Sequence, residues 1–162
     1  MPYFAAVFAR VPGGWTGDEV DLDDLEILDE VTDVIRDAAE EGEPALLFVE
    51  EDDEWFAILR VDGIGEPRVF ISDVRAPTTS ELAALLYEGA EETAQAGEDD
   101  EEEEQARALA DEPGGDVDLL EDLGIPADEL LALTTREGVL PGDVISAVAD
   151  RVSFAGELDK LR

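Results

Sequence analysis

The chain has 162 residues, of which 45 are acidic and 10 are basic, and its formal net charge is −35. It contains no His and no Cys, which excludes disulfides, thiolate metal sites and the side chain that most often serves as a general base. Carboxylates repel phosphates, so we expect no direct binding to nucleic acid and an attraction to basic proteins instead.

The N-terminal segment predicts a β-hairpin. Its two strands are Pro2–Val11 and Trp15–Leu22, joined by a tight turn that contains Gly13 and Gly14. The first ten residues lack the basic n-region of a signal peptide, and their apolar stretch ends at the charged Arg10, so we expect a strand there and not a signal peptide. No apolar run approaches the roughly 20 residues that a membrane span needs. We therefore expect a cytoplasmic protein with no membrane contact.

An amphipathic helix is predicted next. Asp23 and Glu26 form a capping-box pattern, and apolar residues recur at three- and four-residue steps from Leu25 onward. The helix is expected to end near Gly42, with Pro44 just beyond it. Its apolar face should cover one side of a sheet.

Three further strands are predicted at Ala45–Glu50, Trp55–Val61 and Arg68–Ser72, which are rich in β-branched and aromatic residues. Apolar residues at adjacent positions indicate that both faces of this sheet are covered. The connection at residues 51–54 is entirely acidic, so we expect a solvated hairpin tip. A second helix should follow, with Thr78 as its N-cap and Glu81 as the partner of that cap.

This order, ββαβββα, predicts an α+β domain over residues 1–90 with an antiparallel sheet of about five strands and covering helices. Residues 91–116 are acidic and flanked by Gly and Pro, which predicts a disordered linker. Residues 117–162 resume an apolar pattern and predict a small helical C-terminal unit. A unit this short should dock on the first domain or on a partner.

No residue is assigned a catalytic, cofactor-binding or metal-binding role. The acidic tip Glu50–Glu54 and the trio Asp21, Asp23 and Asp24 could bind a divalent cation, but a solvated turn and helix capping explain them better. Turn geometry accounts for the glycines, and core packing is a simpler role than a ligand cage for the two Trp residues. No His is present to activate a serine. The remaining candidates weighed in this way are Gly13, Gly14, Gly63, Gly65, Trp15, Trp55, Ser72, Ser80, Ser146, Ser153 and the acidic run Glu98–Glu104.

Several segments carry a family resemblance: MPYFAAVFAR, GGWTGDEVDLDDLE, PALLFVEEDDEWFAILRVDG, PRVFISD, LGIPADELLAL and LPGDVISAVADRVSFAGELDKLR. They resemble the actinobacterial tRNA adenosine deaminase-associated proteins, and a composition with no Asn and a single Lys suggests a GC-rich genome. The resemblance implies an association with the deaminase that converts adenosine to inosine in tRNA, chiefly as a genomic neighbour. It implies no established activity and no functional residues. The chain cannot itself be that deaminase, whose zinc ligands are His and Cys.

The favoured hypothesis is a non-catalytic accessory protein that contacts this deaminase or another basic protein. One alternative is an acidic nucleic-acid mimic, or a regulator of another basic DNA- or RNA-binding protein. A weaker third option is an enzyme that uses carboxylates and a loosely held Mg²⁺.

Overall fold

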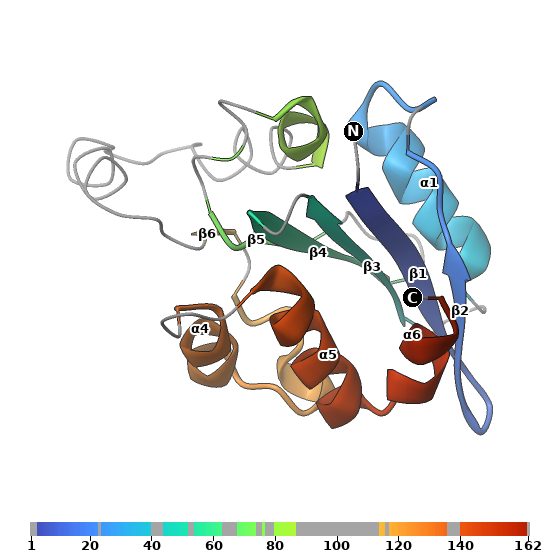
Figure 1. Ribbon diagram of the computed structural model, residues 1–162. Coiled ribbons are helices and arrows are strands. Elements are labelled where there is room, and N and C mark those ends of the chain that lie inside the picture. The colour runs from blue at the N-terminus through green and yellow to red at the C-terminus, as the bar shows by residue number, and fades with distance from the viewer. Residues whose placement is uncertain are drawn as a thin grey trace.

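An antiparallel sheet organises the computed structural model, which describes residues 3–22, 24–39, 44–51, 54–62, 68–73, 76, 80–86, 114–115, 117–135 and 140–161. The strand order is β2-β1-β3-β4-β5-β6, with helices on both faces (Figure 1). The strands are β1 Tyr3–Val11, β2 Gly14–Glu19, β3 Pro44–Glu51, β4 Trp55–Asp62, β5 Arg68–Ile71 and the two-residue β6 Gly114–Gly115. The predicted α+β class and its antiparallel sheet are confirmed.

Strand β2 ends earlier than predicted, at Glu19 and not at Leu22. Beyond it, the backbone N–H of Leu22 donates to the side-chain hydroxyl of Tyr3 at 2.8 Å, so this group has a partner outside the strand ladder. The chain turns there and Leu22 becomes buried. At the other end of the hairpin Gly13 has φ of 89°, the left-handed conformation that a tight turn requires.

The two faces of the sheet bury separate cores, because side chains alternate along each strand. On β1, Ala5 and Val7 face one core, whereas Ala6 and Phe8 face the other. The first core lies against helix α1, Leu28–Ala38, and against the helical residues 81–86. The second lies against the C-terminal helices (Figure 1). Coverage on both faces, which the adjacent apolar positions predicted, is thus confirmed.

Helix α1 starts later than predicted, at Leu28, and its cap is a different carboxylate. Oε1 of Glu30 accepts hydrogen bonds from the backbone N–H groups of Glu26 and Ile27, at 2.7 and 3.3 Å. Glu30 is therefore the capping-box carboxylate, a role that the sequence pattern assigned to Glu26, about one helical turn earlier. The helix ends at Ala38, before the predicted end at Gly42. Both Gly42 and the predicted N-cap Asp23 lie outside the described residues.

The second helix is capped by Ser80, whose hydroxyl accepts the backbone N–H of Ala83 at 3.2 Å. The helical residues begin at 81. Thr78, the predicted cap, lies outside the described residues. The same hydroxyl also makes a tertiary contact, which is described below.

The C-terminal unit packs on the second face of the sheet. It comprises the 3-10 turn η2 Glu121–Leu123 and the helices α4 Ala127–Thr135, α5 Pro141–Val152 and α6 Ala155–Leu161 (Figure 1). Phe154, between α5 and α6, stacks on Phe8 of β1 with ring centroids 4.3 Å apart. The unit therefore docks on the sheet, which was one of the two expected arrangements.

The division into three domains stays a prediction. Gly114 and Gly115, which the sequence analysis placed in the acidic linker, pair with β5 as strand β6. The rest of that predicted linker lies outside the described residues. In the part of the chain that the structure describes, no helix is both long enough and apolar enough to cross a bilayer.

Candidate functional site

A cavity of about 400 Å³ lies on the α1 face of the sheet, beside the start of β1. The start of β1 and the helical residues 81–86, which are labelled or coloured in Figure 1, both contribute to its lining. We call it the acidic pocket. Its lining residues come from β1, the end of β3, the segment before α1 and the second helix, and they are Tyr3, Leu22, Leu25, Glu26, Glu51, Glu81, Leu82 and Leu85.

Glu51 is the buried carboxylate of the pocket, with only 4% of its surface exposed. Its Oε1 accepts a hydrogen bond from Nε1 of Trp55 at 3.1 Å and one from the hydroxyl of Ser80 at 2.5 Å. Burying a carboxylate is costly unless donors replace the lost water, and these two donors do so. The Ser80 hydroxyl thus connects the carboxylate to the cap of the second helix.

This arrangement corrects the expectation of a fully solvated acidic tip at residues 51–54. Glu51 belongs to β3 and follows Val49 at the two-residue step that points to the α1 face. Glu50 is buried as well, whereas Glu54 is exposed. The prediction failed because Trp55, directly opposite Glu51 in the ladder, supplies a donor that a charge count does not reveal.

Tyr3 fixes the wall of the pocket next to α1. Its hydroxyl accepts from the backbone of Leu22 and donates to Oδ1 of Asp21 at 3.2 Å. These two bonds tie residues 21–22 to the first residue of β1. They place Leu22 and the following turn, closed by the Leu25 N–H to Leu22 carbonyl bond at 3.1 Å, against the cavity.

The chemistry of the acidic pocket is that of an acceptor for positive charge. Glu26, Glu51 and Glu81 contribute carboxylates, the four leucines contribute apolar walls, and none of the described lining residues is cationic. Within the described ranges, no three carboxylates are grouped closely enough to hold one metal ion. The pocket therefore suits an extended cation with an apolar part better than a phosphate or a single metal ion.

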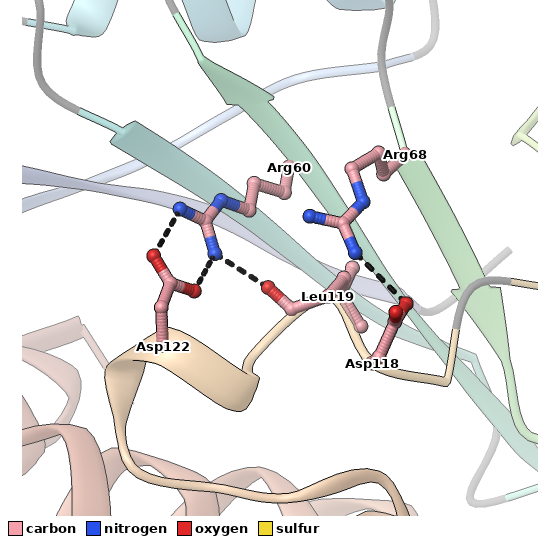
Figure 2. A network of polar contacts seen from close by, with 5 residues as sticks. All are labelled: Arg60, Arg68, Asp118, Leu119 and Asp122. Carbon is pink, nitrogen blue, oxygen red and sulfur yellow. Dashed lines mark hydrogen bonds and ion pairs between the residues drawn. The ribbon is translucent and has the colours of Figure 1, made fainter.

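A second polar cluster lies on the opposite face, where Arg60 and Arg68 stand directly across β4 and β5 from each other. Two positive side chains directly opposite each other in a sheet repel, and two aspartates of the C-terminal unit neutralise their charges. Arg60 binds both oxygens of Asp122, at 2.5 and 2.8 Å, and Arg68 binds Asp118 at 2.8 Å. Figure 2 shows both guanidinium groups reaching towards the same stretch of chain.

Arg60 is the buried member of this cluster, with 5% of its surface exposed. Its Nη1 also donates to the carbonyl oxygen of Leu119 at 2.6 Å (Figure 2). The hydrogen bonds from Arg60 hold the pKa of Asp122 below its ordinary value, against a smaller opposing effect of burial. The cluster attaches the C-terminal unit to the sheet, so its role is structural.

The same pairing extends to other basic side chains. Each forms an ion pair with a carboxylate, and the pairs are Arg36–Asp33, Arg60–Asp122, Arg68–Asp118, Arg151–Glu129 and Lys160–Glu157. These cations are therefore neutralised within the chain. For these five described cations, contact with a nucleic acid would compete with a carboxylate of the chain itself.

Three of the remaining candidates of the sequence analysis, Trp15, Trp55 and Ser72, have structural roles in the fold. Trp15 packs near Phe154 on one face and Trp55 is buried in the core on the other, so they cannot form one cage. The Ser72 hydroxyl accepts the backbone N–H of Phe56 at 2.9 Å. Ser146 and Ser153 are exposed. The candidates at 23, 52–53, 63, 65 and 98–104 lie outside the described residues.

The sequence analysis did not identify the pocket itself. Tyr3 was assigned only to a strand, and Leu22 and Leu25 to a strand and a helix. The one available signal was the two-residue period of β3, which puts Glu51 on the same face as Leu47 and Val49. Which segments close over that carboxylate depends on the path of residues 20–22, 24–27 and 80–86, and no local pattern in the sequence indicates this path.

A known protein family matches most of the chain. The family is described as Rv3753c-like tRNA adenosine deaminase-associated protein, and its model matches residues 3–155. The chain belongs to this family. The match spans the sheet, the acidic pocket and most of the C-terminal unit, so family membership extends over both faces of the fold. No curated protein and no solved structure matches the chain.

Proposed function

We propose that the protein is a non-catalytic accessory protein of a tRNA adenosine deaminase and that it acts in the cytoplasm by contact with a basic protein surface. The family description, with its association to that deaminase, supports this proposal. The chain lacks the His and Cys residues that would hold a catalytic zinc ion, so it would assist the enzyme and not replace it.

The charge distribution is the observation that carries the proposal. A net charge of −35 remains after the basic side chains named above have been paired internally, so the surface offered to a partner is negative. An enzyme that binds tRNA needs a basic surface, because its affinity depends on cations placed against phosphate. The two surfaces are complementary, and contact between them would modulate access of tRNA or suppress nonspecific RNA binding.

A pull-down with the purified full-length chain and the deaminase of the same organism tests the proposal. We expect a complex at low ionic strength that weakens as salt is raised, since the Debye length falls from roughly 30 Å at 0.01 M to about 3 Å at 1 M. An unrelated basic protein, such as lysozyme, is the control and should be released at lower salt. Failure to form a complex even at the lowest salt would refute the proposal.

Titration of tRNA with the isolated protein tests the mode of action. With 10 basic residues against 45 acidic ones, we expect no shift of tRNA at near-physiological salt. Any effect on editing should then require the deaminase to be present. Micromolar binding of tRNA by the protein alone would contradict both the electrostatic argument and the mechanism by protein contact.

A second function fits the same charge: an acidic nucleic-acid mimic, or a regulator of another basic DNA- or RNA-binding protein. The consecutive acids at residues 98–104 favour it, because a run of carboxylates imitates the charge spacing of a polyanion. Capture from native lysate with the tagged full-length chain discriminates the two. Recovery of nucleoid or transcription proteins supports the mimic, whereas recovery of the deaminase supports the accessory protein.

A further inference from the structure

The acidic pocket has an acceptor atom that the described part of the chain leaves available. Both hydrogen bonds to the Glu51 carboxylate end on Oε1, and no described residue donates to Oε2. An ionised carboxylate can accept more than the two hydrogen bonds that Glu51 has here, and among the described residues its Oε2 is not one of the fully enclosed unpartnered atoms, so this oxygen is open to the cavity. Because Glu51 lines the cavity, a ligand there can complete that set.

The ligand must be positively charged and elongated. Glu26 and Glu81 add negative charge to that of Glu51, yet the three carboxylates do not converge on one metal ion among the described residues. Leu22, Leu25, Leu82 and Leu85 form the walls between them. An alkyl stem with a cationic head matches this pattern, because long basic side chains bury their methylenes on apolar surface and keep their charge on polar groups.

We propose that the acidic pocket binds an arginine side chain of a protein partner, with the stem between the leucines and the guanidinium on Glu51. A guanidinium is more weakly hydrated than an ammonium and forms paired hydrogen bonds with a carboxylate, so it suits a buried acceptor better. This inference rests on the proposed function, which calls for a basic protein partner.

A protein is favoured over a free amine by the surface beside the pocket. Ile27 directly follows the lining residue Glu26 and is 55% exposed, which is unusual for a large apolar side chain at the start of a helix. A bound protein would cover Ile27, whereas a small amine inside the cavity would leave it in water.

NMR titration of the full-length chain, with its leucine and isoleucine methyl groups labelled, tests the proposal. The probe is acetyl-Gly-Arg-Gly-amide, and its citrulline analogue is the neutral control of the same shape. We expect the arginine peptide to shift the methyl signals of the four pocket leucines with a Kd on the order of millimolar, as befits one side chain. The citrulline peptide should not shift them.

Matched variants locate the binding site. Glu51→Gln keeps a carbonyl oxygen for Trp55 and Ser80 but places an amide group where the cation binds, and it should weaken binding by about tenfold. Glu81→Gln, at an exposed lining residue, should weaken it less and serves if Glu51→Gln does not fold. Glu121→Gln removes the same charge from the unit on the opposite face of the sheet and should leave binding unchanged.

Three results would overturn the inference: equal shifts with the citrulline peptide, binding that is insensitive to both pocket variants, or tighter binding of putrescine than of the arginine peptide. The last would assign the pocket to a free amine. If the peptide binds but no deaminase complex forms, the arginine pocket is supported and the proposed partner is rejected. If a deaminase complex forms but the peptide does not bind, the partner is supported and the arginine pocket is rejected.

Discussion

Replacing Asp122 by Asn removes the charge that faces the buried guanidinium of Arg60. In the native protein Arg60 makes two hydrogen bonds to this carboxylate and one to the carbonyl oxygen of Leu119. Asn keeps one acceptor and turns an N–H group towards another N–H group. The Asp122→Asn protein therefore holds a buried cation that has lost the charge of Asp122 and one of the three hydrogen bonds just described.

The cost follows from the exposure of the two partners. A hydrogen bond to a charged group contributes about 1.5–3 kcal/mol, and breaking a fully buried ion pair costs about 3–5 kcal/mol. The side chain of Asp122 is 62% exposed, so water screens this pair and the upper range does not apply. We expect Asp122→Asn to lower the free energy of unfolding by about 1–2 kcal/mol.

Equilibrium unfolding in urea, followed by Trp fluorescence, measures this loss. Trp15 lies 5.6 Å from the ring of Phe154, so its emission reports on docking of the C-terminal unit. Asp150→Asn is the control, since Asp150 is an exposed α5 residue of the same unit. It should change stability by less than about 0.5 kcal/mol.

Arg60→Met completes the comparison. It replaces the buried cation by an apolar side chain, and Asp122 can then be hydrated because it is largely exposed. In the Arg60→Met background, Asp122→Asn should therefore cost almost nothing. A loss for Asp122→Asn no larger than that of Asp150→Asn, or an equal loss with and without Arg60, would refute the assigned role of the pair.

The remaining predictions concern pH, close packing and the acidic run. The folded-state pKa of Asp122 is lowered, so the stability that the pair contributes is present above the ordinary pKa of about 3.9 and is lost as the pH falls through the folded-state pKa. The difference in urea midpoint between wild type and Asp122→Asn should therefore shrink from pH 7 to pH 3. A constant difference would contradict this prediction. Gly17→Ala should lower stability by about 1–3 kcal/mol, because its Cβ would lie 2.6 Å from the ring of Phe8. Gly156→Ala meets nothing within 4 Å and should melt at an equal or higher temperature, so equal behaviour of both variants would count against the packing argument. Deletion of residues 97–104, which include no apolar side chain, should leave a cooperative melt at the same or a higher temperature, and a clear decrease would show that the run packs on the fold.

The sequence by itself determined the framework. Strands β1, β3, β4 and β5 were predicted to within about two residues at each end, because short β-branched and aromatic runs bounded by turn residues are a local property. Pro141 marked the start of α5 in the same way. The exclusion of zinc deaminase chemistry also follows from composition alone.

The tertiary structure decided how polar groups are paired. Arg60 and Asp122 are separated by 62 residues in the sequence, and Glu51 and Ser80 by 29, so no local sequence pattern indicates either contact. The caps observed in the described residues, Glu30 for α1 and Ser80 for the second helix, have a related explanation. Several acids and hydroxyls could serve each helix end, and the chain path that closes the core positions Glu30 and Ser80.

The acidic pocket belongs to this second group. Its carboxylate is buried because Trp55 and Ser80 donate to it, and Leu22 forms part of its wall because the hydroxyl of Tyr3 binds residues 21 and 22 just beyond β2. Periodicity fixes which face a side chain occupies, but a cavity depends on where separate segments meet above that face. That meeting is set by the sum of many long-range contacts, each of them weak and without a local signature in the sequence.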